Sequence, residues 1–213
     1  VLTLIGGIIP SKKAAKEADV VVMVLGEHGF STGEARSRTN LDLPGLQQEF
    51  LEEIYKINPN IVLVLNNGRP LTISWAAEKI PTIVEAWQLG TETGNAVAQV
   101  LYGDYNPSGK LPMSFPRNIG QVPIAYNHYS TGRFTNKDNN VFWSHYSDVE
   151  KTPLYPFGYG LSYTTFEYSN LKINKKTFSK GEKVEVSVDL KNTGKVTGKE
   201  VAQLYLHDVF ASV

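Results

Sequence analysis

Three continuous apolar runs constrain the fold of this chain, because their unbroken apolar character is typical of strands buried on both faces. They are DVVVMVL at 19–25, NIVLVLN at 60–66 and PTIVEAW at 81–87. A half-exposed strand would instead alternate apolar and polar residues. The runs therefore predict three adjacent parallel strands in one sheet, with helices on both faces.

The segments between and beside these runs have helical character, which a parallel sheet requires of its crossovers. A short helix is predicted over 11–18, with Ser11 as its cap. The segment LQQEFLEEIYKI at 46–57 places its large apolar residues on one helical face. A further helix is predicted over 92–103 and closed by Gly103.

This alternation predicts an α/β domain over residues 1–125, built on a helix-covered, mostly parallel sheet. Residues 126–165 are rich in glycine, proline and aromatic side chains, so we interpret them as an ordered connector that is too aromatic to be disordered. The segment KVEVSVDLKNTG at 183–194 alternates apolar and polar residues, as a half-exposed antiparallel strand does. Residues 166–213 are therefore interpreted as the opening strands of a β-sandwich.

Composition argues against several classes of function. The 21 basic and 21 acidic residues give a net charge of zero, so no basic field points to nucleic acid or to an anionic membrane. No apolar run approaches the ~20 residues of a membrane-spanning helix. The chain has no cysteine, and its four histidines show no i, i+4 pairing, so no metal site is predicted. No phosphate-binding glycine motif occurs, and no cofactor is expected.

The polar segment GEHGFSTGEARSR at 26–38 directly follows the first apolar run. In open α/β sheets ligands bind beyond the carboxyl ends of the strands, which is where Glu27 and Glu34 are expected to lie. A glutamate can act as a general acid when apolar burial raises its pKa. From spacing alone, both glutamates could equally be solvated carboxylates paired with Arg36 and Arg38, and both readings stay open.

Two other patterns near the strand ends have structural interpretations. GFSTG at 29–33 fits the G-x-S-x-G nucleophile elbow of hydrolases, but that elbow needs a helix starting directly behind Ser31, and no helix is expected before about residue 45. Its glycines are therefore interpreted as bends of the loop. NNGRP at 66–70 follows the second apolar run and is interpreted as a structural turn.

Four stretches together resemble glycoside hydrolase family 3, and most closely its bacterial periplasmic β-glucosidases: ADVVVMVLGEHGFSTGEARSRTNLDLPG, VLVLNNGRPL, EAWQLGTETGNAVAQVLYGDYNPSGKLPMSFP and LYPFGYGLSYTTF. The resemblance runs from about residue 15 to the C-terminus. It implies an enzyme of three parts: a barrel with an aspartate nucleophile, an α/β sandwich domain with the acid/base glutamate on a loop, and a fibronectin type III-like domain. We therefore expect a C-terminal-half fragment, whose α/β domain lacks its first strand and whose fibronectin-like part is truncated.

The resemblance also implies roles for individual residues. Glu34 matches the family's acid/base glutamate, and Glu27 is its competitor because the length of this loop varies across the family. Arg36, Arg38 and His28 are then expected to bind substrate or to orient the loop. The implied reaction is the retaining hydrolysis of terminal β-D-glucosyl residues, in which two carboxyls lie ~5–5.5 Å apart.

The same resemblance sets the expected partners and location. The partners are a β-glucoside or oligosaccharide substrate, the absent barrel domain of the same chain, and a second copy in a homodimer of the complete enzyme. The expected location is the bacterial periplasm or the extracellular medium. A non-catalytic scaffold or a carbohydrate-binding module is the alternative function.

Overall fold

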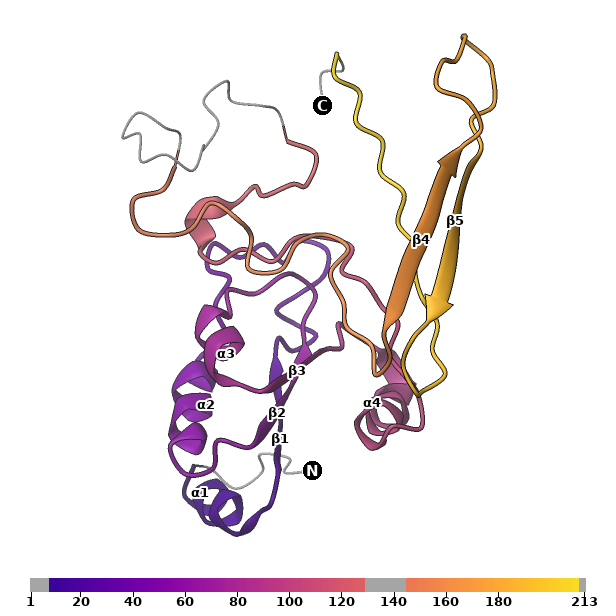
Figure 1. Ribbon diagram of the computed structural model, residues 1–213. Helices are drawn as coiled ribbons and strands as arrows, with labels where there is room; N and C mark the ends of the chain where they lie inside the picture. Colours follow the sequence, from indigo (N-terminus) through magenta and orange to yellow (C-terminus); the bar gives the residue numbers. More distant parts are fainter. Residues whose placement is uncertain (1–7, 129–144, 211–213) are drawn as a thin grey trace. The chain divides into compact units, whose positions relative to one another are not determined.

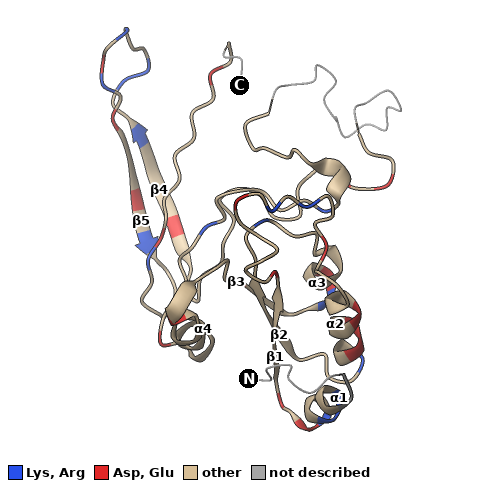
Figure 2. Cartoon of the chain, turned by 180° about the vertical axis from the view of Figure 1, so that it is seen from behind, with Lys and Arg blue, Asp and Glu red and all other residues tan. Residues whose placement is uncertain are grey.

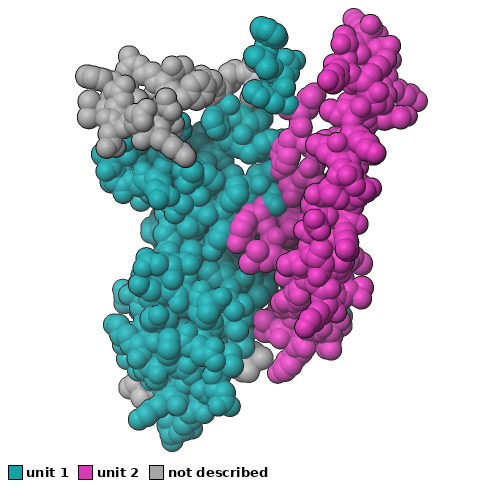
Figure 3. Space-filling view, viewed as in Figure 1, with its two compact units in different colours: residues 1–94, 111–158, 207–213 teal, residues 95–110, 159–206 magenta. Residues whose placement is uncertain are grey.

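The computed structural model describes residues 8–128 and 145–210, and its contacts divide the chain into two compact units (Figures 1 and 3). Unit 1 comprises residues 1–94, 111–158 and 207–213, and unit 2 comprises residues 95–110 and 159–206. The helices and strands are α1 (Ile8–Glu17), β1 (Val21–Gly26), α2 (Gln47–Tyr55), β2 (Ile61–Asn66), α3 (Ser74–Lys79), β3 (Thr82–Glu85), α4 (Thr93–Tyr102), β4 (Phe166–Ile173) and β5 (Val186–Asn192).

The sheet of unit 1 is parallel, with its strands in the order β1-β2-β3. Val21 pairs with Ile61, and Val62 pairs with Thr82. The prediction that the three apolar runs form adjacent parallel strands is confirmed. Because parallel strands share one direction, the carboxyl ends of all three lie at the same edge of the sheet.

One face of this sheet forms the core of unit 1, together with the three helices that lie on it (Figures 1 and 2). Leu63 and Leu65 of β2 are fully buried, as is Leu51 of α2. On the opposite face, Val24 of β1 is 49% exposed. Its partner Val64 of β2, on the same face, is 1% exposed, so the exposure of Val24 reflects its place on the edge strand β1. Helices α1 to α3 lie on one face, and helix cover of the second face stays a prediction. An unbroken apolar run shows that both faces are apolar, but it does not show what covers each of them.

The helices of the structure differ from the predicted ones in two ways: one begins earlier, and one was not predicted. Helix α1 begins at Ile8, so Ser11 is a buried residue inside the helix and not its cap. Helix α3 was not predicted, because its six residues are too few to show an apolar period. Helix α4 ends next to Gly103, whose φ of +81° suits a glycine that closes a helix, as predicted.

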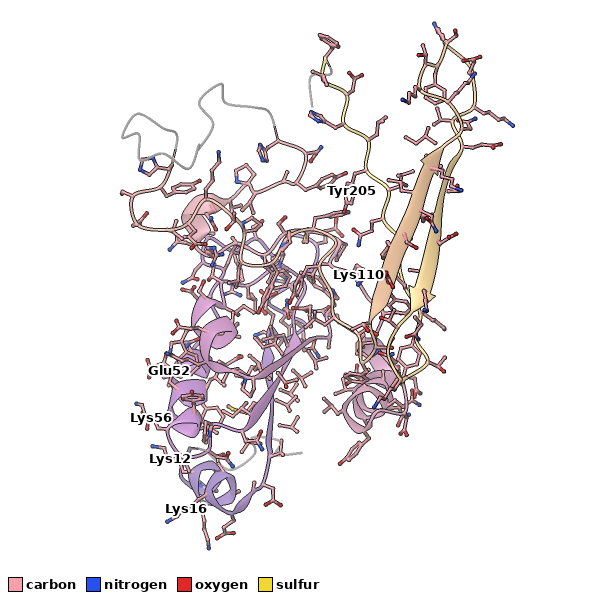
Figure 4. The ribbon with its side chains drawn as sticks, in the orientation of Figure 1. Lys12, Lys16, Glu52, Lys56, Lys110 and Tyr205 are labelled. Carbon is pink, nitrogen blue, oxygen red and sulfur yellow. The ribbon has the colours of Figure 1, made fainter. Side chains whose placement is uncertain are left out.

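The outer surface of α1 and α2 carries a small ion cluster. Lys12 of α1 and Lys56 of α2 bind the carboxylate of Glu53 at 2.6 and 2.5 Å, and Figure 4 labels both lysines. Figure 2 shows that acidic residues gather along α2. Water screens exposed pairs of this kind, so the apolar core, not this cluster, holds the helices in place.

Unit 2 contains a two-stranded antiparallel sheet, in which Phe166 of β4 pairs with Asn192 of β5 and Ile173 pairs with Val186. The register shifts between Ser169 and Lys172, as at a β-bulge. The predicted antiparallel strand is therefore present. The structure shows a small antiparallel sheet here and does not establish the fibronectin type III-like detail.

Two sequence motifs that are far apart along the chain are tied together by hydrogen bonds. In unit 2, the side-chain oxygen of Asn106 accepts bonds from the Tyr163 N–H at 2.8 Å and the Ser162 hydroxyl at 2.9 Å. In unit 1, Phe115 N–H donates to the Tyr155 carbonyl at 2.8 Å, and the Phe115 ring is buried. These contacts explain why the glycine- and proline-rich segments are ordered without long helices.

The predicted domain boundaries at 125 and 165 stay predictions. The predicted connector, 126–165, includes residues 129–144, which lie outside the described residues. Helix α4 was assigned to the first domain, whereas most of it groups with unit 2. In the described ranges, no helix has the length and apolar character that crossing a membrane would require.

Candidate active site

The loop between β1 and α2 starts at the carboxyl edge of the sheet, and its first residues are rigidly held. The Gln47 side chain accepts a bond from the Gly26 N–H at 2.6 Å and donates one to the Gly26 carbonyl at 2.8 Å. The Glu27 N–H donates to the Asn66 carbonyl at 2.7 Å. Gly26 has a φ of +131°, and a Cβ on it would overlap the Asn66 carbonyl oxygen, so only glycine fits where the loop leaves the strand.

Glu27 is buried, and its carboxylate is occupied by donors from the loop itself and from the turn after β2. Arg38 Nη1 lies 2.8 Å and Arg69 Nε 3.0 Å from its Oε1, and the Gly68 N–H donates to its Oε2 at 3.1 Å. Burial by itself would raise the pKa of Glu27. The hydrogen bonds from Arg38 and Gly68 and the charge of Arg69 outweigh this effect and lower the pKa below 4.5. Glu27 is therefore an ionised structural anchor, and its geometry does not suit a proton donor.

Glu34 has the opposite environment. It lies in a tight turn in which the Arg36 N–H donates to the Gly33 carbonyl at 3.1 Å, and its side chain is exposed. Gly33 has a φ of +125°, and Ala35 has a φ of +57°, which is uncommon for a residue with a side chain. Among the described residues, none forms a hydrogen bond or an ion pair with the Glu34 carboxylate. The turn presents this carboxylate to whatever approaches the edge of the sheet.

The other predicted site residues divide into two groups. Arg38 is engaged by Glu27 and also donates to the Asp42 carbonyl at 3.0 Å, so the structure gives it a loop-orienting position. His28 accepts a bond from the Phe30 N–H at 3.1 Å through its Nδ1, which also orients the loop. The Arg36 side chain, in contrast, is exposed beside Glu34, where it could meet a ligand.

Ser31 also has a local structural role in this loop. Its hydroxyl donates to the His28 carbonyl at 2.8 Å, and helix α2 begins only at Gln47. A nucleophile elbow needs a helix directly behind the serine. The geometry therefore agrees with the interpretation of GFSTG as a loop bend.

Sequence reasoning missed Arg69, which stands in the turn after β2. Its Nη2 donates to the Ser31 carbonyl at 3.0 Å and to the Arg36 carbonyl at 2.9 Å, and its Nε faces Glu27. The sequence did indicate where Arg69 lies. Ligands bind beyond the carboxyl ends of parallel strands, and Arg69 follows the second apolar run just as Glu27 follows the first.

Sequence reasoning also missed Glu85 at the end of β3. Its Oε1 accepts a bond from the Trp87 N–H at 3.0 Å, and its Oε2 lies 3.4 Å from Asn67 Nδ2. Burial raises the pKa of Glu85 to about 7, although these two hydrogen bonds act in the other direction. Asn67 is fully buried, and within the described part of the chain its Oδ1 has no hydrogen-bond partner. This edge of the sheet therefore holds two buried carboxyls that differ: the pKa of Glu85 is raised, whereas that of Glu27 is lowered.

The two carboxylates of the loop differ sharply. Glu27 is buried and paired, whereas Glu34 is exposed and has no partner among the described residues. Across the described ranges, no group of three or more histidine, aspartate or glutamate side chains is arranged to hold a metal ion.

Comparison with known proteins identifies relatives of this architecture. The sequence pattern of the glycosyl hydrolase family 3 C-terminal domain matches residues 8–163. The chain is 50% identical over 202 residues to a periplasmic beta-glucosidase of Salmonella typhimurium, covering 94% of this chain and 26% of that protein. It is 47% identical over 200 residues to a beta-xylosidase of Formosa agariphila, covering 94% of this chain and 27% of that protein.

A solved structure agrees with these sequence relatives. The crystal structure of a beta-glucosidase from Listeria innocua in complex with glucose superposes with a TM-score of 0.90 at 42% identity, covering 97% of this chain and 29% of that chain. The chain spans about a quarter of the length of the curated relatives that it matches.

Proposed function

The chain belongs to glycosyl hydrolase family 3, and from that membership we propose that it is the C-terminal part of a retaining β-glucosidase. The complete enzyme hydrolyses terminal β-D-glucosyl residues, with Glu34 as its acid/base. The aspartate nucleophile lies in a barrel domain elsewhere in the same polypeptide. The relatives support this division, because this chain corresponds to only 26% of the periplasmic beta-glucosidase that it resembles.

The contrast between the two loop carboxylates carries the assignment. The acid/base of a retaining glycosidase must reach the glycosidic oxygen and exchange a proton with it. Glu27 has both carboxylate oxygens engaged by Arg38, Arg69 and Gly68 and is shielded from solvent. Glu34 is exposed at the tip of a turn and has no competing donor among the described residues. Its position supports the role that the family resemblance gives it.

The reaction then proceeds in two steps that use Glu34 twice. In the first step, the protonated Glu34 donates its proton to the departing glycosidic oxygen while the nucleophile of the barrel attacks the anomeric carbon. In the second step, the Glu34 carboxylate takes a proton from water, which attacks the glycosyl-enzyme and regenerates both carboxyls. The exposed Arg36 is placed to contact the sugar or the aglycone beside Glu34.

Two further features belong to the proposal. Strands β4 and β5 open a fibronectin type III-like domain, as the family resemblance implies. The enzyme acts in the periplasm or outside the cell, and the name of the Salmonella typhimurium relative supports a periplasmic location. A β-xylosidase is the second candidate activity, because the Formosa agariphila relative with that name is 47% identical. Assays with β-glucosides and β-xylosides of the same aglycone separate these two activities.

The test is Glu34→Ala in the complete enzyme. We expect kcat/KM for phenyl β-glucoside, whose aglycone needs protonation, to fall ~10²–10⁴-fold, whereas dinitrophenyl β-glucoside loses far less. Azide, an anionic nucleophile that needs no base, should restore turnover and give a β-glucosyl azide. Glu49→Ala, which removes a glutamate from α2, is the control. If Glu27→Ala, and not Glu34→Ala, lost activity and was rescued by azide, Glu27 would be the acid/base. If neither variant lost activity, the non-catalytic alternative would be favoured.

A further inference from the structure

We propose that Arg69 is the positioning residue of the acid/base: its guanidinium clamps the two flanks of the turn that presents Glu34. This inference rests on the proposed function of Glu34. It assigns to Arg69 a part in catalysis although Arg69 does not contact the Glu34 carboxylate.

The clamp is formed by three contacts from one rigid group. Arg69 Nη2 donates to the Ser31 carbonyl at 3.0 Å and to the Arg36 carbonyl at 2.9 Å, and Nε lies 3.0 Å from the Glu27 carboxylate. The two carbonyls stand on either side of Glu34 in the sequence. Because a guanidinium is planar and its donors point in fixed directions, these contacts define the distance between the two flanks of the turn.

The turn depends on being held from outside. Ala35, directly after Glu34, has a φ of +57°, and Gly33, directly before it, has a φ of +125°. A non-glycine residue in this conformation is disfavoured and persists only where its surroundings impose it. The bond from Arg69 to the Arg36 carbonyl is a contact next to Ala35 that comes from outside the loop. Without it, Ala35 can relax toward negative φ, and the Glu34 carboxyl changes its direction.

Arg69 is itself fixed to the sheet, so it can serve as a reference point for the loop. The fully buried Asn67 donates from its Nδ2 to the Arg69 carbonyl at 2.8 Å. The neighbouring Gly68 contacts the loop directly, because a Cβ on Gly68 would overlap the Thr32 hydroxyl. The end of β2 and the loop therefore form one packed unit, with Arg69 at its centre.

A positioning role differs measurably from a purely structural one. Loss of the clamp should harm only those steps in which Glu34 transfers a proton, since Arg69 binds loop carbonyls and Glu27, not the substrate. A general loss of folded enzyme would instead lower the rates for all substrates equally. A misplacement of about 1 Å can cost on the order of 10²-fold when catalytic geometry matters.

The experiment compares Arg69→Met and Arg69→Lys in the complete enzyme, each with and without Glu34→Ala. For both Arg69 variants we expect kcat/KM to fall about 10- to 100-fold for phenyl β-glucoside and less than about 3-fold for dinitrophenyl β-glucoside, whose aglycone leaves without protonation. Azide should increase their turnover of dinitrophenyl β-glucoside. In the Glu34→Ala background, either substitution should have no further effect on phenyl β-glucoside, because the group that it positions is gone.

Arg117→Met is the matched control and should leave both substrates unaffected. Arg117 is also half-buried and also binds a carbonyl oxygen, that of Thr152, and a glutamate, Glu150, and neither partner lies in the loop between β1 and α2. Arg69→Lys keeps the charge facing Glu27 and guards against a folding defect of the methionine variant, since an ammonium cannot reproduce the fixed fork.

Equal losses for both substrates, or a full additional loss in the Glu34→Ala background, would overturn the positioning role of Arg69. A Glu34→Ala enzyme with unchanged activity would instead overturn the proposed function. The two failures are therefore distinguishable in one set of assays.

Discussion

Glu27 and Arg38, eleven positions apart in one loop, meet in an ion pair of 2.8 Å between Oε1 and Nη1. Glu27 is the first residue after β1, and Arg38 also binds the Asp42 carbonyl near the end of the loop. The pair therefore closes the loop at its base, and Glu34 lies within the closed segment. Because the Glu27 side chain has no exposed area and Arg38 retains 20%, the pair is largely shielded from solvent.

Glu27→Gln should lower the free energy of unfolding by about 3 kcal/mol, because it leaves Arg38 and Arg69 without their shared buried anion. The pKa of Glu27 is lowered, so its stabilising effect is present above 4.5 and is lost as the pH falls through the folded-state value. Urea unfolding as a function of pH measures both effects. Below pH 4.5 the wild type should approach the variant, and a difference that grew on acidification would contradict this account.

Gly68→Ala should misplace the loop, because the new Cβ would overlap the Thr32 hydroxyl. In the complete enzyme we expect kcat/KM for phenyl β-glucoside to fall about 10-fold, and adding Thr32→Ala should restore most of it, since this removes the overlapping atoms. Gly29→Ala, in the same loop but with no atom within 4 Å of its added Cβ, is the control and should be silent. A loss that Thr32→Ala does not relieve would place the defect elsewhere.

That the three strands are adjacent and parallel could be predicted from the sequence, because unbroken apolar runs, such as the one ending at Leu25, alternate with helical segments. The position of Glu34 on a loop at the carboxyl edge follows from the same topology. The pairing of Glu27 with an arginine of the loop was one of two readings that the sequence left open. The place of Arg69 at this edge follows from the topology as well, but its role could not be predicted. Arg69 binds main-chain carbonyls, and no residue type in the loop marks which carbonyl will be bound.

The protonation state of Glu85 was equally hidden from the sequence. It depends on how far the end of β3 is buried and on Asn67 and Trp87, the two donors that reach the carboxyl. A glutamate at the end of an apolar run could instead have been paired, as Glu27 is. Only the packing of the three strand ends separates these outcomes.

Glu85→Gln should remove one specific part of the pH dependence of stability. Burial raises the pKa of Glu85 from 4.5 to about 7, so the folded state holds a proton that the unfolded state has already lost between these values. The contribution of Glu85 is therefore most favourable below pH 4.5 and is lost as the pH rises to about 7. At ~1.4 kcal/mol per pH unit, this loss is at most about 3.5 kcal/mol.

Glutamine resembles the protonated carboxyl, so the variant should match the wild type near pH 4.5 and exceed it in stability above pH 7. The pH dependence that Glu27 causes falls below 4.5, where its stabilising effect is lost, so the two effects separate along the pH axis. Urea midpoints across this range measure the difference, and Glu78→Gln, on the exposed surface of α3, is the control that should show no such slope. A Glu85→Gln protein less stable than the wild type above pH 7 would mean that the carboxylate is stabilised there, and that Asn67 and Trp87 outweigh the cost of burial.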